Sequence, residues 1–277
     1  MSEIDPEIRR TFSQNSTSYY YSSLFFPSDV RRDVFRLYAY VRTADDFVDE
    51  MPQDRESLLE FRRMTFDNWE SGESGNKTVD LFLRVARDNG FERRWVKAFL
   101  DSMETDLTKS GYETLDETLE YIYGSAEVIG LMMCRILGLS PEASHNARML
   151  GRSMQYCNFI RDIEEDRQMG RRYMPSEEIE RYGLKSLTED EAMSKTDSFR
   201  EFMRRQIERY WNWQEKAEDG FGYIPYRVRV PVILSSRLYK WTAERIYERP
   251  EILYETQVKP SKPRIAVELA KSFAGKN

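Results

Sequence analysis

The chain has 277 residues, a formal net charge of -6 and 40% hydrophobic residues, which is typical of a globular protein large enough to bury a substantial core. Two cysteines and a single histidine, His145, exclude a disulfide framework and a zinc centre built from thiolates or imidazoles, and they disfavour a Ser-His-Asp mechanism. The acidic balance argues against nucleic acid as a partner, and no stretch approaches the roughly 20 apolar residues of a membrane span. Because the first ten residues also lack the apolar core of a secretory signal, we expect a cytoplasmic protein.

Apolar residues recur at spacings of three and four along most of the chain, which predicts helices, and no segment predicts a strand with comparable strength. One such stripe consists of Val34, Leu37, Tyr38, Val41, Ala44 and Val48. A second consists of Leu119, Ile122, Tyr123, Ala126, Ile129 and Met133. We therefore expect a single all-α domain over residues 1–277, with about eight to ten helices.

Turn-forming residues mark where these helices should begin and end. Ser28 and Ser140 are predicted N-caps, while the Asn89–Gly90 pair and residues 182–184 predict breaks. The longest predicted interruption is residues 220–231, where two glycines and two prolines follow a helix that should end near Glu218. A final pair of helices is expected after this loop.

The first acidic cluster is RTADDFVDE, residues 42–50. On a helical wheel started at Val34, Asp45 lies at about 20° and Val41 at about -20°, so Asp45 points the way the core residues point. An unpaired buried carboxylate costs several kcal/mol, so a cation should meet it inside. Arg42 could provide that cation as a structural salt bridge, and a metal ion is the alternative.

The second acidic cluster is QYCNFIRDIEEDRQMGRRYMP, residues 155–175. Asn158, Asp162 and Asp166 follow one another at four-residue steps that turn only about 40° each, and Gln155 lies one turn before Asn158, so the four form a polar stripe along one helix. Like charges at i, i+4 repel, so this arrangement is destabilised unless a cation fills the gap. Two such helices facing each other would make a cage lined with oxygen atoms.

Oxygen ligands without histidine or cysteine suit a hard cation, Mg²⁺ or alternatively Mn²⁺. Mg²⁺ usually completes its coordination with water and substrate phosphates, which predicts a phosphorylated substrate. Basic residues accompany the acidic clusters and the C-terminal part of the chain, namely Arg42, Arg161, Arg171, Arg172, Lys259, Lys262 and Arg264. Abundant Tyr and Phe, as in NSTSYYYSSLFFP at residues 15–27, could line a pocket for a hydrocarbon and stabilise a carbocation.

Four segments together resemble the squalene/phytoene synthase family of head-to-head prenyl transferases. They are NSTSYYYSSLFFP, RRDVFRLYAYVRTADDFVDE, YIYGSAEVIGLM and ARMLGRSMQYCNFIRDIEEDRQMGRRYMP, and their order and spacing hold over most of the chain. The last segment is the most specific, because NxxRDxxED followed by Arg and Tyr-x-Pro is hard to meet by chance. The resemblance implies a single all-α isoprenoid-synthase fold with the acidic helices facing a central cavity.

The resemblance also implies roles for individual residues. Metal binding is implied for Asp45, Asp49, Asn158, Asp162 and Asp166, and four of these, the aspartates, are also implied in catalysis. Substrate binding is implied for Ser16, Ser18, Arg42, Gln155, Arg161 and, by a looser match, Tyr254. Tyr38 and Tyr121 match tyrosines near the reacting carbons. The chain departs from the family at Asn15, at Glu165 and in a shortened tail after Tyr254.

The implied reaction is a Mg²⁺-dependent condensation of two prenyl diphosphates through a cyclopropylcarbinyl diphosphate. We expect geranylgeranyl diphosphate as substrate and phytoene as product, with farnesyl diphosphate and a C30 product as the alternative. No G-x-G-x-x-G follows a strand, so NADPH is not expected. Peripheral contact with a membrane is compatible with apolar substrates, although no basic amphipathic helix stands out.

Two other hypotheses about the function are compatible with the sequence. A non-catalytic family member acting in assembly would be expected to have lost acidic ligands, whereas both motifs are intact here. A head-to-tail transferase or a terpene cyclase shares the use of aspartate and magnesium, but the paired acidic helices and RRYMP fit those families less well.

Overall fold

The computed structural model describes residues 10, 12 and 17–273. This part of the chain contains α-helices, short 3-10 and π-helical turns and no strand, so the predicted all-α class is confirmed. The α-helices are α2 (Thr17–Ser23), α3 (Ser28–Asp49), α4 (Arg55–Asp67), α5 (Lys77–Asp88), α6 (Arg93–Thr105), α7 (Leu115–Ile122), α8 (Val128–Ile136), α9 (Ser144–Arg161), α10 (Ile163–Gln168), α11 (Ser176–Arg181), α12 (Glu189–Ser194), α13 (Thr196–Glu218), α14 (Tyr226–Glu248), α15 (Ile252–Glu255) and α16 (Lys262–Phe273). The described residues thus form fifteen α-helices, more than the eight to ten expected, because short helices such as α10, α11, α12 and α15 follow the long ones; ten of the fifteen have eight or more residues.

Several helix ends are fixed by the residues that the sequence singles out. Ser140 caps the 3-10 turn Pro141–Ala143 by accepting from the Glu142 amide, as predicted. Gly90 and Gly183 have positive φ and follow the ends of α5 and α11, which confirms both predicted breaks. The predicted N-cap Ser28 is wrong, because α3 begins at Ser28 and its cap is Pro27.

The predicted loop over residues 220–231 is mostly helical, which corrects the sequence expectation. A 3-10 turn covers Asp219–Tyr223, and α14 begins at Tyr226 and runs through Pro231. Proline near the start of a helix removes one backbone hydrogen bond, and burial of apolar neighbours such as Val228 and Leu234 offsets that cost. The helix that ends at Glu218 was predicted correctly.

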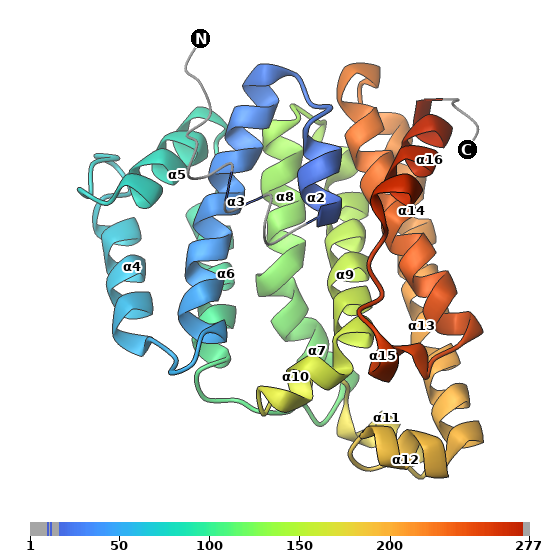
Figure 1. The fold of residues 1–277 in the computed structure, drawn as a ribbon. Coiled ribbons are helices and arrows are strands. Elements are labelled where there is room, and N and C mark those ends of the chain that lie inside the picture. Colours follow the sequence, from blue (N-terminus) through green and yellow to red (C-terminus); the bar gives the residue numbers. More distant parts are fainter. Residues whose placement is uncertain (1–9, 11, 13–16, 274–277) are drawn as a thin grey trace.

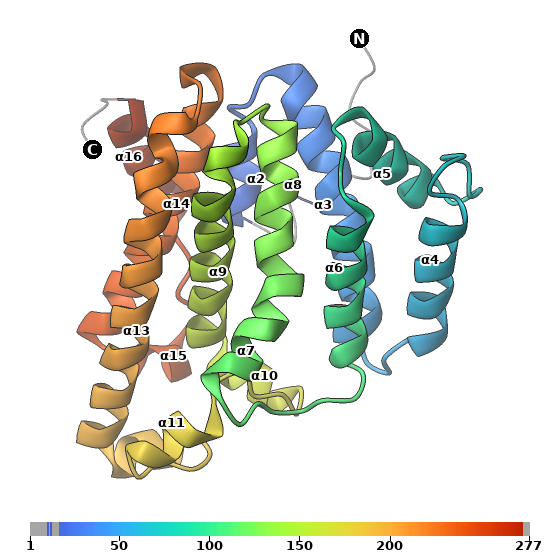
Figure 2. The ribbon, with the colours of Figure 1, turned by 180° about the vertical axis from the view of Figure 1, so that it is seen from behind.

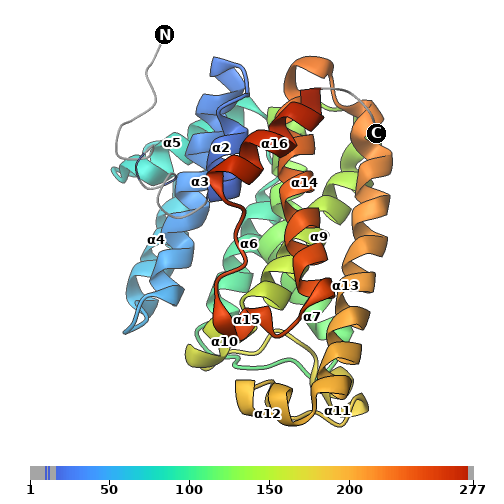
Figure 3. The ribbon, with the colours of Figure 1, turned by 45° about the vertical axis from the view of Figure 1, so that its right-hand side comes forward.

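The long helices pack side by side around the centre of the molecule (Figure 1). α3 and α9 run in the same direction, so that their carboxyl ends lie at the same end as α10, and the view from behind shows α6 and α13 flanking α8 and α9 (Figure 2). Figure 3 shows α16 lying at the other end, beside α2 and α14. This arrangement brings the two acidic segments to one end of the helix bundle.

The wall formed by α8 and α9 depends on glycines that allow two backbones to approach closely. A Cβ atom at Gly130 would lie 2.3 Å from the carbonyl oxygen of Ala147, and one at Gly151 would lie 2.4 Å from that of Ala126. No side chain larger than hydrogen fits at either position without moving the helices apart. No helix in residues 17–273 combines the length and the apolar character needed to cross a membrane.

Candidate active site

An apolar cavity of about 300 Å³ lies between α2, α3, α8, α9 and the start of α14. Most of its wall consists of aliphatic, aromatic and small side chains. Polar side chains enter the wall at Gln155 and Asn158 of α9, and the Tyr38 ring of α3 lines it as well. Such a cavity suits a long hydrocarbon whose polar group lies near the carboxyl end of α9.

A π-helical turn, Tyr123–Glu127, interrupts the helix formed by α7 and α8. It places Ser125 and Ala126 in the cavity wall, and the Ser125 hydroxyl is buried with no hydrogen-bond partner in the described structure. Turns of this kind are frequent at functional sites. Glu127, the last residue of this turn, does not line the cavity. Its buried carboxylate instead pairs with Arg148 at 2.8 Å and with Arg152 at 2.6 Å.

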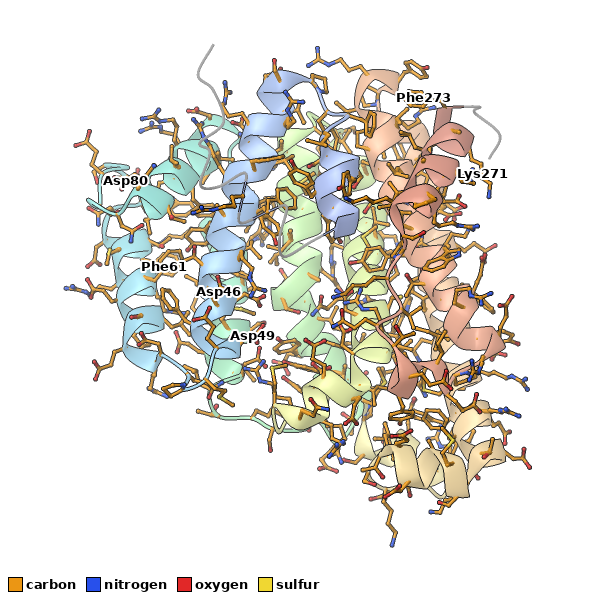
Figure 4. All side chains as sticks on the ribbon, viewed as in Figure 1. Asp46, Asp49, Phe61, Asp80, Lys271 and Phe273 are labelled. Carbon is orange, nitrogen blue, oxygen red and sulfur yellow. The ribbon has the colours of Figure 1, made fainter. Side chains whose placement is uncertain are left out.

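The end of α3 carries the first acidic cluster, and Figure 4 shows Asp46 and Asp49 on the lower half of this helix. Arg42 lies 3.2 Å from Asp45 and also pairs with Asp46, so the salt bridge considered for Asp45 is present. Asp45 is not sealed in the core, because 37% of its side-chain surface remains accessible. Burial of its remaining surface, and then the nearby Asp49 carboxylate, nevertheless raise the pKa of Asp45 to about 7.

The second acidic cluster spans a break in the helix, which corrects the expected continuous stripe. α9 ends at Arg161, Asp162 has φ -100° and ψ 19°, and α10 begins at Ile163. Backbone hydrogen bonds still connect Asp162 to Asn158 and Asp166 to Asp162, both at 2.8 Å, so the four-residue spacing survives the kink. The polar stripe therefore bends toward α3 instead of continuing straight.

The polar atoms of this stripe are partly unsatisfied. Asn158 donates to Gln155 at 3.2 Å, while its Oδ1 atom is buried and accepts no hydrogen bond within the described residues. Arg161 binds Asp162 through Nε at 2.7 Å. Burial, and then the Asp162 carboxylate, raise the pKa of Asp166 to about 8. A cation bound beside these carboxylates would stabilise their ionised forms.

The ends of α3 and α10 come together, as the sequence predicts. Arg171 lies 2.6 Å from Asp49 and also donates to the Val48 carbonyl, and Asp49 is among the charges that raise the pKa of Asp166. In the part of the chain that the structure describes, no three acidic, histidine or cysteine side chains converge closely enough to hold an ion. The arginines hold the carboxylates instead. The donor set of carboxylates and one unsatisfied amide oxygen fits a hard divalent cation that also takes ligands from a substrate.

One further acidic residue beside this site is not evident from the sequence. Asp106, at the end of α6, is 7% exposed and accepts hydrogen bonds from the hydroxyls of Tyr121 at 2.5 Å and Tyr173 at 2.9 Å. Burial raises its pKa to about 6, against the effect of the Tyr121 hydrogen bond and of nearby Arg171. Asp106 therefore connects the predicted Tyr121 to the charges at the ends of α3 and α10.

Tyr239 of α14 is a second residue that the sequence did not single out. Burial raises the pKa of its hydroxyl, and the neighbouring Arg161 and Asn158 oppose this effect. Its position in a late apolar stripe gave no sign that it would meet the acidic helices. It adds an aromatic side chain beside the stripe of α9.

The other residues predicted to act in the site are two tyrosines and two serines. The Tyr38 ring stacks on Phe12, and burial raises the pKa of its hydroxyl to about 12. Tyr254 is half-buried, and its hydroxyl donates to the Leu187 carbonyl at 2.6 Å, so this hydroxyl already has a structural partner. Ser16 lies outside the described residues, and Ser18 belongs to α2 with a side chain that the structure does not describe.

Residues 12–264 match the family model described as squalene/phytoene synthase. The chain belongs to the squalene/phytoene synthase family. The predicted enzyme class, a head-to-head prenyl transferase, is confirmed at the level of the family. The all-α fold of the described residues agrees with this assignment.

Individual relatives support the same assignment. Phytoene synthase 2, chloroplastic, of Solanum lycopersicum is 30% identical over 282 residues, covering 95% of this chain and 87% of that protein. The chloroplastic phytoene synthase of Narcissus pseudonarcissus is 30% identical, and the match covers 84% of this chain but 57% of the relative. The structure of a dehydrosqualene synthase in complex with ligand has a TM-score of 0.87 at 23% identity, covering 97% of this chain and 94% of that one, which shows a shared fold.

Proposed function

We propose that this protein joins two molecules of geranylgeranyl diphosphate head to head and releases diphosphate, giving phytoene. One observation carries the proposal: Gln155 and Asn158, which precede the acidic residues of α9–α10, line an apolar cavity, and the acidic ends of α3 and α9–α10 meet at the same end of the bundle. A hydrocarbon bound in this cavity would place its diphosphate among the carboxylates and arginines. Relatives described as phytoene synthases support the same substrate class.

We propose that Mg²⁺, with Mn²⁺ as a substitute, is held by oxygen atoms of Asp45, Asp49, Asn158, Asp162 and Asp166. When bound, the ion would neutralise the charge of the leaving diphosphate. The unsatisfied Oδ1 of Asn158 and the raised pKa values of Asp45 and Asp166 support this ligand set. Substrate would take over the arginines that now pair with these carboxylates.

The side chains proposed to hold the diphosphates are Arg42, Arg161, Gln155, Ser16 and Ser18. Arg42 and Arg161 are suited to this role because each already makes ion pairs beside the cavity end, and a guanidinium binds phosphate as well as carboxylate. Tyr254 stays a weaker prediction, since its hydroxyl is bonded to Leu187.

The apolar wall and the tyrosines would guide the carbon chemistry. Loss of diphosphate would leave an allylic cation. The double bond of the second substrate would attack it, and loss of a proton would close the three-membered ring of a cyclopropylcarbinyl diphosphate. A second loss of diphosphate, rearrangement and release of a proton give the hydrocarbon. Tyr38 lines the cavity and would face the cationic carbons with its ring, whereas Tyr121 is not part of the cavity wall and would act from its position beside Asp106. The apolar wall would exclude water that would quench the cation.

Small side chains in the cavity wall favour the longer C20 substrate. Ser22 and Ser23 of α2 line the cavity, and each hydroxyl donates to a backbone carbonyl three residues earlier, so neither needs a partner inside the cavity. The fold shared with a dehydrosqualene synthase makes a C30 product from farnesyl diphosphate the second candidate.

Product analysis tests the proposal. We would incubate the protein with Mg²⁺ and either farnesyl or geranylgeranyl diphosphate, with and without NADPH, and identify the hydrocarbon by mass. A C40 product formed without NADPH is expected. Preference for farnesyl diphosphate would select the C30 candidate, and a head-to-tail or cyclic product would contradict the proposed reaction.

A further inference from the structure

The end of the molecule opposite the acidic side chains carries exposed aromatic residues. Phe25, in the turn between α2 and α3, and Phe273 of α16 are 41% and 54% exposed, and their rings meet edge to face at 6.3 Å. Tyr226, at the start of α14, is 74% exposed, and the adjacent Arg227 lies 3.2 Å from Asp29 of α3. We use the name apolar end face for the surface formed by Phe25, Tyr223, Tyr226, Val267 and Phe273.

The outward surface of α16 has no carboxylate. Its single acidic residue, Glu268, has a side chain that is 4% exposed and lies 2.8 Å from Arg264 and 2.9 Å from Lys271. The exposed positions of this helix are instead small, apolar or basic, including Val267, Lys262 and Lys271. Figure 4 shows Lys271 and Phe273 at the outer edge of the same end of α16. This pattern is that of a basic amphipathic helix.

Glu268 is the reason that this helix does not stand out in the sequence. A glutamate in the middle of KPRIAVELAKSF reads as an exposed charge that breaks the apolar face. The structure turns it inward against the basic residues of α16 and Arg237 of α14. The external charge of the helix is therefore positive.

The cavity reaches toward the same end of the molecule. Its wall includes Ser23 and Phe26 on one side, and Phe221 and Ile224 before α14 on the other. These residues belong to the segments that carry Phe25, Tyr223 and Tyr226. The apolar end face thus adjoins the part of the cavity that lies toward the α2–α3 turn and the start of α14, at the end of the molecule opposite α10 (Figure 1).

We propose that the apolar end face and the lysines of α16 form a docking surface for an anionic lipid bilayer. Phenylalanine and tyrosine side chains favour the boundary between headgroups and acyl chains, and lysines near it are attracted to negative headgroups. The inference concerns binding and does not require catalysis. If the proposed function also holds, an apolar product would leave the cavity beside lipid.

Vesicle sedimentation tests this surface with the full-length chain. The vesicles would contain phosphatidylcholine alone, or phosphatidylcholine with about 30% phosphatidylglycerol. We expect about tenfold or greater preference for the anionic vesicles, weakened by high salt. The double variant Phe25→Ser with Phe273→Ser should lose about tenfold or more in binding, and Lys262→Gln with Lys271→Gln should lose the preference for anionic lipid.

A matched control is Met193→Ser, which alters a side chain that is 46% exposed on α12, at the other end of the molecule (Figure 1). It should bind vesicles as the unchanged protein does, and melting temperatures would show that all variants are folded. The proposal is overturned if the unchanged protein stays in the supernatant, or if the Phe25/Phe273 variant binds equally well. It is also overturned if the unchanged protein forms a concentration-dependent dimer, does not bind vesicles, and loses the dimer in the Phe25/Phe273 variant. In that case a second copy of the chain would cover the apolar end face. Vesicle binding without any hydrocarbon product would refute the proposed function and leave this inference standing.

Discussion

Asp106 links the tyrosines of the site to its charges. Its carboxylate accepts from both Tyr121 and Tyr173, which holds the Tyr121 ring in a single position beside the acidic helix ends. An asparagine at this position has one acceptor oxygen and a competing NH₂ group, so one tyrosine loses its partner. Asp106 is therefore best described as a positioning residue.

We predict that Asp106→Asn lowers product formation about 10²-fold, because a small displacement of a group near reacting atoms costs about this much. It should also change the ratio of cyclopropylcarbinyl diphosphate to final hydrocarbon, measured by mass. Tyr173→Phe, which leaves the bond between Asp106 and Tyr121, should have a smaller effect. An unchanged product ratio in Asp106→Asn, together with a lowered melting temperature, would reduce its role to stability.

Ser23 offers a test of how the cavity selects chain length. Its buried side chain lines the cavity and donates to the Tyr20 carbonyl. Ser23→Phe would fill this part of the cavity and exclude the longer tails, so we predict a shift of about tenfold or more in favour of farnesyl over geranylgeranyl diphosphate. The ratio of kcat/KM values for the two substrates measures it, and Ser71→Phe on the exposed surface is the control. An unaltered ratio would place the determinant elsewhere.

At the scale of helices, α12 shows how one side chain fixes the segment that leads into a helix, whose N-cap is Thr188. The Glu191 carboxylate accepts from the backbone amides of Lys185, Ser186 and Leu187 and pairs with Lys195 at 3.1 Å. Burial opposes ionisation, but these hydrogen bonds outweigh it and lower the pKa of Glu191 to about 2. The depressed pKa means that the folded state favours the ionised form.

We predict that Glu191→Gln lowers the free energy of unfolding by about 1 to 2 kcal/mol at pH 7. Because the folded pKa lies below the ordinary value near 4.3, this stabilisation is complete above that value and is lost as pH falls toward about 2. Urea unfolding of both proteins at several pH values measures the difference. A difference that stays constant from pH 7 to pH 2 would contradict the assignment.

The periodicity of the sequence predicted the long helices well, because their buried faces repeat every three or four residues. It did not predict the kink at Asp162. The polar residues keep their four-residue spacing across the kink, because the Asp166 amide still donates a hydrogen bond to the Asp162 carbonyl, so the spacing gives no sign of the break. It also placed a loop where α14 runs through Pro231, because packing outweighs the local preference of proline there. Local sequence patterns thus predict where helices occur better than they predict where helices bend.

At the scale of the whole molecule, the sequence predicted which acidic segments would meet but not what lies between them. Arg42 was a predicted partner of Asp45. The hydrogen-bonded ion pair between Arg171 and Asp49 was not predicted, because it joins residues 122 positions apart and follows only from tertiary packing. Asp106 is a single acidic residue with no periodic partner, so no pattern could assign it to the site. The inward position of Glu268 in α16 likewise follows only from its contacts with Arg264 and with Arg237 of α14.

The central claim is that the acidic ends of α3 and α9–α10 form a site for a divalent cation and a prenyl diphosphate. Diphosphate release from geranylgeranyl diphosphate, measured with and without Mg²⁺, tests it most directly. We predict Mg²⁺-dependent release by the unchanged protein and by the surface control Asp88→Asn, and about 10³-fold slower release by Asp45→Asn with an unchanged melting temperature. Release that persists after chelation of divalent ions, or that is equally fast in Asp45→Asn, would contradict the account.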